Sequence, residues 1–364
     1  MVLPFLTLYL TGKELHRTLS EAGFVMAMFG LGSVIGAYFG GKFSDKIGFY
    51  KVQLITLFGG AIMFIILGQL KSYPLICICT FFLSMINEAF RPANSSAIAF
   101  YSTPENRTRS YSLNRLSINL GWAVGVSIGG LIAAYDYELL FWVDGFTNLL
   151  AVLLLFYFLK PKVQPKKEEI IKEDVPEVMS AYKDKTYLRF LFLMVLFSSC
   201  FAQLFTTIPK YFRDDLLLNE KYIGMIMAVN GIIIVAIEMV LVYILEKRNR
   251  TTRYIVIGLV FCSFSYLSLL IPGNAKFISL LMILFISMGE IMAMPFMNTF
   301  WIKRTNDRNR GQYAALYTIS WGIGNTLGPF LCSALIDHTS FQVGFIALAF
   351  VLFCSAFGFY KLKS

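Results

Sequence analysis

The sequence predicts an all-α membrane protein built as two six-helix bundles that are related by an internal repeat. Hydrophobic residues make up 57% of the 364 residues and the mean hydropathy is +0.65, which is too apolar for a water-soluble domain. The chain also repeats itself, first at an offset of 201 residues and later at an offset of 203. The repeated pairs are Gly23 and Gly224, Met26 and Met227, Ala27 and Ala228, Gly30 and Gly231, Pro92 and Pro295, Arg107 and Arg310, Gly121 and Gly324, and Gly125 and Gly328. Duplicated apolar bundles are an architecture that membrane transporters favour and enzymes rarely use.

The positions of the helices follow from the length of the apolar runs, because a spanning helix needs about 20 apolar residues. The predicted spans are 21–41, 52–70, 74–101, 111–135, 139–159, 188–210, 222–245, 254–272, 277–302, 312–336 and 341–360. An apolar segment from Met1 to Leu10 precedes them and is too short to cross a bilayer. Within it, Val2-Leu3-Pro4 aligns with Thr207-Ile208-Pro209, where about 20 residues of helix precede the proline. We therefore expect the chain to start inside its first helix, through a misassigned start codon or a truncated sequence.

Loop composition predicts the domain boundaries and the orientation. We expect an N-terminal bundle at 1–159 with a partial first helix, a cytoplasmic linker at 160–187 and a C-terminal bundle at 188–364. The linker carries Lys-Pro-Lys and Lys-Lys-Glu-Glu runs, a composition that cannot bury a core. The loops on the linker side hold about three times as many Lys and Arg residues as the loops on the other side. This bias predicts that both termini are cytoplasmic, in a bacterial inner membrane.

Several function classes are disfavoured by the residues that are missing or scattered. The formal charge is +10, but Lys and Arg lie in short loops rather than on one face, so no nucleic acid is expected. All six cysteines lie in apolar stretches without a CxxC pattern, and His16 and His338 stand alone, so no metal is expected. No nucleotide-binding loop and no HExxH occurs. We therefore expect that the protein is not an enzyme and has no cofactor. We expect a proton gradient to be its energy source.

One loop carries a sharp motif, the segment Gly41-Lys-Phe-Ser-Asp45-Lys46-Ile-Gly48-Phe-Tyr-Lys51. It resembles the signature loop of the major facilitator superfamily, in which a glycine, an aspartate, a basic residue and a second glycine recur at this spacing. We expect Gly41 and Gly48 to permit a tight turn. The resemblance implies that Asp45 latches the inner side when the carrier opens outward. Tyr50 departs from the pattern, and the alternative is a basic topogenic loop with a turn.

The span at 111–135 carries a second pattern of small residues, Gly121, Gly125, Gly129 and Gly130. It resembles the antiporter motif of that superfamily, although Val126 stands where the motif has proline. In the second half Gly324 and Gly328 are followed by Pro329. Small residues at this spacing let helices approach closely, so generic helix packing is the alternative. Among the branches of the superfamily, the chain looks most like the drug:proton antiporters, which include multidrug efflux carriers.

Charged and polar side chains at membrane depth are the candidate pathway residues, because such groups are costly in hydrocarbon unless they face a cavity or a partner. The candidates are Glu88, Arg91, Arg115, Asn119, Glu238 and Glu290. Glu88 and Arg91 are spaced i, i+3 on one helix and could simply pair with each other. Glu290 has no basic residue within a helical turn, so we expect it to take up and release protons. Glu88 and Glu238 are the next candidates for this role. The alternative is packing against a basic residue of another helix.

The sequence therefore predicts a secondary transporter that works by alternating access and exports lipophilic or amphipathic small molecules in exchange for protons. Its expected partners are membrane lipid, a small-molecule substrate and protons, and we expect a monomer. Two alternatives stay open. One is uptake of a small polar nutrient by proton symport, and the other is a membrane receptor or lipid-handling scaffold that kept the fold without transporting.

Overall fold

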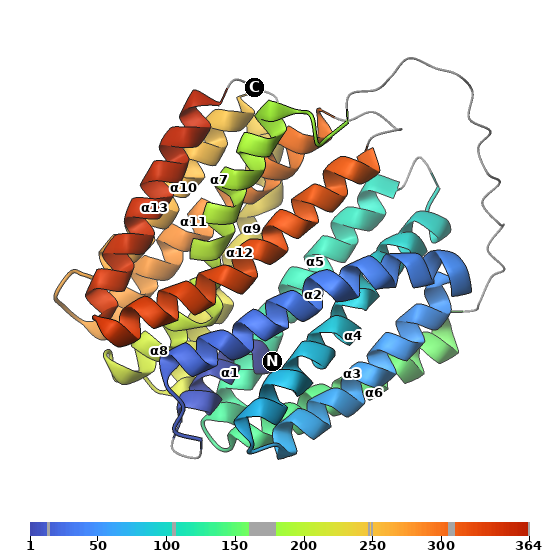
Figure 1. The fold of residues 1–364 in the computed structure, drawn as a ribbon, viewed down its shortest axis with the longest axis horizontal. Helices are drawn as coiled ribbons and strands as arrows, with labels where there is room; N and C mark the ends of the chain where they lie inside the picture. Colours follow the sequence, from blue (N-terminus) through green and yellow to red (C-terminus); the bar gives the residue numbers. More distant parts are fainter. Residues whose placement is uncertain are drawn as a thin grey trace.

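The computed structural model describes residues 1–12, 15–103, 107–159, 180–246, 248, 250–304 and 310–362. Within these ranges the regular structure is entirely helical (Figure 1). The first-half helices are α1 (Val2–Thr11), α2 (Leu19–Ile47), α3 (Phe49–Gln69), α4 (Tyr73–Tyr101), α5 (Arg107–Ala133) and α6 (Tyr137–Phe158). The second-half helices are α7 (Lys185–Phe201), the short 3₁₀ helix η1 (Ala202–Phe205), α8 (Thr207–Asp214), α9 (Glu220–Glu246), α10 (Thr251–Ser268), α11 (Ala275–Ile302), α12 (Arg310–His338) and α13 (Phe341–Lys361).

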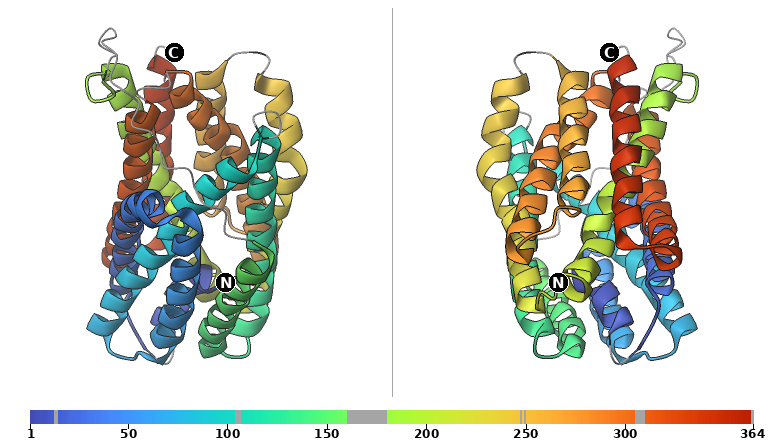
Figure 2. Two further views of the ribbon diagram at one scale, coloured as in Figure 1. Left: turned by 90° about the vertical axis from the view of Figure 1, so that its right-hand side faces the viewer. Right: turned by 90° about the vertical axis from the view of Figure 1, so that its left-hand side faces the viewer.

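The two halves lie side by side, with α1 to α6 at the lower right of Figure 1 and α7 to α13 at the upper left. Successive long helices run in opposite directions, so the connections gather at two ends. We call the end that holds the α6–α7 connection the linker end. The α2–α3, α4–α5, α9–α10 and α11–α12 connections lie at the same end. The distal end holds the α1–α2, α3–α4, α5–α6, α8–α9, α10–α11 and α12–α13 connections. The two side views of Figure 2 show the same packing of long helices from either edge.

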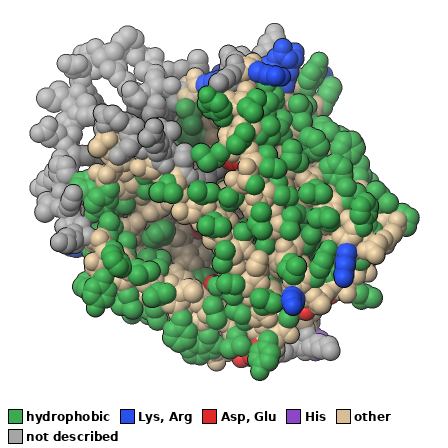
Figure 3. Space-filling model, turned by 180° about the vertical axis from the view of Figure 1, so that it is seen from behind, with side chains coloured by type: hydrophobic (Ala, Val, Ile, Leu, Met, Phe, Trp, Pro, Cys, Tyr) green, Lys and Arg blue, Asp and Glu red, His purple; other side chains and the backbone are tan. Residues whose placement is uncertain are grey.

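Eleven helical segments among the described residues are long and apolar enough to cross a membrane, and α1 is a shorter apolar helix. The predicted all-α membrane fold is confirmed, and the predicted spans coincide with these helices to within a few residues at most ends. The surface agrees with this assignment, because large apolar side chains such as Tyr157, Phe158 and Phe350 are exposed. Figure 3 shows one face that is covered largely by hydrophobic side chains and is hollowed near its middle. A lipid environment accommodates such a surface, whereas water does not.

The helix predicted at 21–41 is longer than predicted and runs from Leu19 to Ile47. Its start is set by a capping box: the Glu21 N–H donates to Thr18 Oγ1 at 3.1 Å, and the Thr18 N–H donates to Glu21 Oε2 at 2.9 Å. Its end is set by Gly48, whose φ of 91° is a conformation that favours glycine.

The span predicted at 188–210 is present within Lys185–Asp214, but its helix is interrupted after Phe201 and continues through η1 into α8. Thr206 leaves the helical region with φ −124° and ψ −73°. Pro209 in the first turn of α8 has no N–H to donate back across the break. The side chain of Gln203 compensates by accepting hydrogen bonds from Thr207 Oγ1 at 2.7 Å and Thr206 Oγ1 at 3.2 Å. Irregular backbone at membrane depth is thus stabilised by buried polar side chains.

The halves meet mainly where α2 packs on α12 and where α5 packs on α9. Figure 1 shows α2 and α12 lying next to each other along the boundary between the halves. The α5–α9 crossing is close: a Cβ placed on Gly130 would lie 2.7 Å from the Cα of Gly224. On the other crossing, Gly30 lies against Thr326 of α12. Only glycine permits such approach of two backbones, which explains why Gly23, Gly30, Gly224 and Gly231 recur in the repeat.

Candidate functional site

The carboxylate of Glu290 lies in the middle of α11 and is bound by a side chain from α9. Asn230 Nδ2 donates to Glu290 Oε2 at 3.2 Å and to Ser287 Oγ at 3.0 Å. Ser287 in turn donates to the Ile283 carbonyl within α11 at 2.7 Å, and both Asn230 and Ser287 are buried. Spacing along α11 could not show this contact, because the amide comes from another helix. The result is a polar cluster between two helices, in which Asn230 and Ser287 are buried and Glu290 is partly buried.

Glu238 is the second acidic candidate in this half, and its side chain is only 5% exposed. It lies on α9 two turns further toward the linker end than Asn230. A carboxylate at this depth costs several kcal/mol without partners. The structure thus places Asn230, Glu238 and Glu290 on two adjacent helices of the second half.

In the first half, Glu88 and Arg91 pair with each other on α4. Arg91 Nε lies 3.2 Å from Glu88 Oε2, and a second contact joins Nη2 to Oε1 at 3.4 Å. The Arg91 side chain is 75% exposed, whereas the Glu88 side chain is 23% exposed. The ion pair that the i, i+3 spacing allowed is present, so the two halves hold their carboxylates differently: by an arginine on the same helix in α4, and by an amide from a neighbouring helix in α11.

A ladder of amides joins three helices near this pair. Gln53 Nε2 of α3 donates to Asn94 Oδ1 of α4 at 3.3 Å, and Asn94 Nδ2 donates to Asn114 Oδ1 of α5 at 3.0 Å. Asn119, one turn further along α5, is half-buried at the crossing with α9, where its carbonyl faces Gly231. The side chain of Arg115 lies outside the described part of the structure, so its predicted role stays a prediction.

The motif from Gly41 to Lys51 is helical over most of its length. The prediction that Gly41 takes part in a tight turn is wrong, because Gly41 lies inside α2, where a Cβ would lie 4.0 Å from Pro92 Cβ. The turn is made by Gly48 alone, directly before α3. Lys46 and Lys51 are exposed on either side of it. The side chain of Asp45 lies outside the described residues, so the latch stays a prediction.

The glycines of the small-residue motif have different surroundings. Gly130 packs against the backbone of α9, and a Cβ placed on Gly129 would lie 3.1 Å from the Phe5 ring of α1. Gly125 has only Met1 near it, and nothing lies within 4 Å of Gly121. In the second half a Cβ on Gly324 or on Gly328 would overlap α7, at Ser198 and Ser199, and Pro329 follows inside α12. Helix packing thus accounts for four of these six glycines, and Gly121 and Gly125 take no part in a tight crossing.

Sequence reasoning missed the polar contacts that join the two halves at the distal end. Arg213 of α8 donates from Nη1 to the Leu8 carbonyl at 2.8 Å and from Nη2 to Thr11 Oγ1 at 3.0 Å, both at the end of α1. Tyr137 Oη donates to Glu220 Oε1 at 2.8 Å. The Ser20 N–H donates to Asp337 Oδ2 at 2.6 Å. These residues flank turns, and their partners are far apart in the chain, so no local signal marked them.

The linker end carries a different cluster, which lies entirely within the second half. Asp184 caps α7 by accepting from the Tyr187 N–H at 3.0 Å, pairs with Arg304 at 3.0 Å and accepts from Tyr313 Oη at 2.9 Å. Burial raises the pKa of the Asp184 carboxyl, but the hydrogen bonds from Arg304, Tyr187 and Tyr313 outweigh burial and hold this pKa below its usual value. The cluster ties the start of α7 to α12 and to the end of α11.

The two bundles are joined by polar contacts at the distal end and by close crossings of α2 with α12 and of α5 with α9, and polar side chains lie in the middle of spans. These features define a membrane transporter fold of two joined bundles. The chain matches the family model of the Major Facilitator Superfamily over residues 1–319 and belongs to that superfamily. It is a transporter and not an enzyme.

The chain is also similar, at low identity, to two bacterial proteins and, in its fold, to a solved structure. It is 25% identical over 366 residues to a Na(+), Li(+), K(+)/H(+) antiporter of Planococcus maritimus, covering 90% of this chain and 84% of that protein. It is 22% identical over 339 residues to the quinolone resistance protein NorA of Staphylococcus aureus, covering 93% of this chain and 86% of that protein. The crystal structure of the nucleoside transporter NupG superposes with a TM-score of 0.79 at 16% identity, covering 99% of this chain and 95% of that one.

Proposed function

We propose that this chain is a proton-coupled exporter of lipophilic or amphipathic small molecules that works by alternating access. Proton coupling is supported by the hydrogen bond from Asn230 of α9 to the Glu290 carboxylate in the middle of α11. An amide can donate to an ionised carboxylate and, after turning its oxygen toward it, accept from a protonated one. Such a site supports both protonation states without moving a helix. Relatives named for antiport and for quinolone resistance favour the same direction of coupling.

We further propose that the linker end faces the cytoplasm and that the structure is the inward-facing state. The positive-inside bias of the loops supports this orientation. Among side chains that the structure describes, the hydrogen bonds between the halves lie at the distal end, at Arg213, Tyr137 and Ser20. A carrier sealed on one side and joined by close helix crossings can open the other side by rocking its halves.

The test is accumulation of substrate inside everted membrane vesicles that contain the full-length chain, with a quinolone and ethidium as substrates and an imposed proton gradient. Glu290→Gln should lower gradient-driven flux by at least about ten-fold, because the amide that replaces the carboxyl cannot exchange a proton. Glu138→Gln is the matched control, since Glu138 pairs with Lys71 at the distal end. Retention of flux by Glu290→Gln refutes proton coupling through this residue. Accumulation of the dye in intact cells, rather than loss, refutes export.

A second candidate function is exchange of monovalent cations for protons, which the antiporter of Planococcus maritimus suggests. Glu290 and Ser287 bring a carboxylate and a hydroxyl oxygen to the Asn230 amide, which adds its own oxygen if it turns over, and oxygen is the ligand that hard cations prefer. In the same vesicles, addition of Na⁺ or K⁺ alone should collapse the proton gradient if this function is present. A gradient that responds to the quinolone and not to cations favours drug export.

A further inference from the structure

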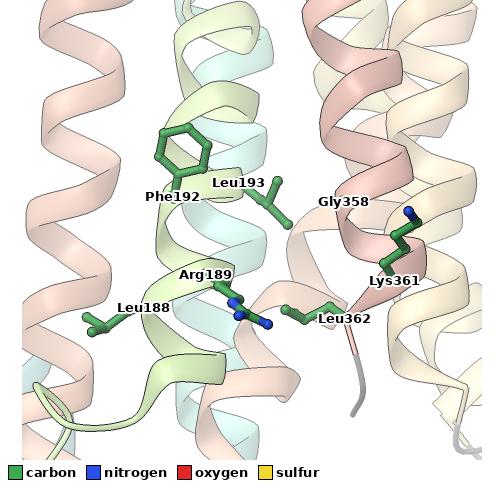
Figure 4. A pocket seen from close by; sticks show the side chains of 7 residues that line it. All are labelled: Leu188, Arg189, Phe192, Leu193, Gly358, Lys361 and Leu362. Carbon is green, nitrogen blue, oxygen red and sulfur yellow. The ribbon is translucent and has the colours of Figure 1, made fainter.

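A groove at the linker end lies between the first turns of α7 and the last turn of α13, on the outer surface of the second half. Its volume is about 430 Å³. Leu188, Arg189, Phe192 and Leu193 line it from α7, and Gly358, Lys361 and Leu362 line it from the end of α13 (Figure 4). None of these residues belongs to the carboxylate sites or to the contacts between the halves.

The walls of the groove are apolar and fixed in place. Phe192 is 63% exposed and Leu188 is 40% exposed, although both are large hydrophobic side chains. Ser355 Oγ donates to the Leu193 carbonyl at 3.1 Å, which joins α13 to α7 beside the groove. At Gly358 a Cβ would lie 2.5 Å from Leu193 Cδ2, so Leu193 packs directly on the α13 backbone in the wall of the groove. An apolar chain is therefore the natural occupant of its interior.

The rim carries two cations and no acid. Arg189 and Lys361 are exposed, and no carboxylate lines the groove. Lys361 Nζ lies 4.4 Å from the centre of the Phe357 ring, and no ion pair is found for Arg189 or Lys361 among the described residues. In Figure 4 the guanidinium of Arg189 extends toward Leu362 across the gap between the helices. The charge at the rim is therefore available to an anion.

We propose that this groove binds an anionic phospholipid, with the headgroup phosphate at Arg189 and an acyl chain between α7 and α13. Lys361, whose amino group lies on the other side of the end of α13, adds positive charge to the attraction. The groove begins at the level where both helices enter the membrane, since α7 starts at Lys185 and α13 ends at Lys361. Basic pockets at this level are complementary to acidic headgroups, and the apolar interior is complementary to the chain below them. A soluble anion would gain nothing from Phe192 and Leu193.

The experiment measures lipid bound to the purified full-length protein by native mass spectrometry, with dioleoyl-phosphatidylglycerol or dioleoyl-phosphatidylcholine added. The wild-type protein should bind the anionic lipid roughly 10- to 30-fold more tightly, as expected for two cations near a headgroup. R189Q/K361Q should abolish this preference. R248Q/R250Q is the matched control, because Arg248 and Arg250 are exposed at the same end but away from the groove. Thermal unfolding and gel filtration establish that each variant is folded.

Gly358→Leu tests the acyl chain separately, because its side chain fills the groove without changing the charge. It should lower binding of both lipids, whereas Gly121→Leu, which has open space around it, should not. The proposal is overturned if the wild-type protein does not prefer the anionic lipid, if R189Q/K361Q keeps the preference, or if Gly358→Leu keeps full binding. Since the assay uses no transport, its result is independent of the proposed substrate and coupling.

Discussion

The distal end and the linker end of this protein use their charged side chains differently. At the distal end Arg213, Tyr137 and Asp337 bond across the boundary between the halves. At the linker end Asp184 pairs with Arg304 and accepts a hydrogen bond from Tyr313, and all three residues belong to the second half. One end therefore joins the halves, and the other strengthens a single half. For a molecule built from two bundles, this difference indicates where the halves are held together and where they can separate.

The largest expected effect comes from removing the distal contacts of Arg213. Arg213→Ala removes two charge-assisted hydrogen bonds to α1, which together should shift the balance toward distal opening by about 3 kcal/mol, or roughly 100-fold. The measurement is the distance between spin labels at Tyr135 and Leu217, one in each half and both exposed, with exposed Cys354 replaced by serine.

Arg17→Ala is the control for this measurement. Arg17 lies at the same end but pairs with Glu21 of its own half at 3.3 Å. It should leave the label distance unchanged. A distance that stays at its wild-type value in Arg213→Ala would show that this arginine does not hold the distal end closed.

The next effect concerns the α5–α9 crossing. Gly130→Ala places a Cβ 2.7 Å from the Gly224 Cα and should lower the free energy of unfolding by about 2 kcal/mol through overpacking. Gly121→Ala, with nothing within 4 Å, should leave stability equal or slightly higher because alanine favours helix. Thermal unfolding in detergent measures both. Equal stability of the two variants would contradict the close crossing.

A smaller effect is expected at the linker end from Asp184→Asn. Because the pKa of Asp184 is lower in the folded protein than in the unfolded chain, its carboxylate stabilises the fold above its unfolded pKa, and this stability is lost as the pH falls through the folded value. The variant should lose about 1–2 kcal/mol at pH 7, and this difference should shrink as the pH falls below about 4. Unfolding of the wild-type protein and the variant at several pH values measures this stability difference. A stability difference that does not change with pH would contradict the lowered pKa of Asp184.

The smallest effect is expected at Asp215, at the distal end, and has the opposite sign. Burial and then the neighbouring Asp214 raise the pKa of the Asp215 carboxyl, so its ionised form slightly destabilises the fold at neutral pH. Asp215→Asn should therefore raise the unfolding temperature a little at pH 7 and leave it unchanged at low pH. A fall in this temperature at pH 7 would contradict the raised pKa. The same pH series serves both variants.

The sequence predicted the fold better than it predicted the contacts within it. Apolar runs located the spans, since hydrophobic length alone decides what crosses a bilayer. The break after Phe201 was missed because the segment Lys185–Asp214 as a whole has the length and apolar composition of one span, and the bonds to Gln203 are seen only in the structure. The turn at Gly48 was predicted, but the helix continues through Gly41, because glycine is tolerated within a helix where packing favours it.

By itself the sequence determined the duplicated membrane architecture, the positions of its spans and the superfamily, because repeats, hydrophobicity and local motifs are present along the chain. Only the tertiary structure decided that Asn230 reaches Glu290, that Gly130 and not Gly121 forms the close crossing, and that Arg213 joins the halves at the distal end. Each of these contacts brings together side chains or backbones from different helices. Their partners depend on how the helices pack and rotate against each other, which no single helix encodes.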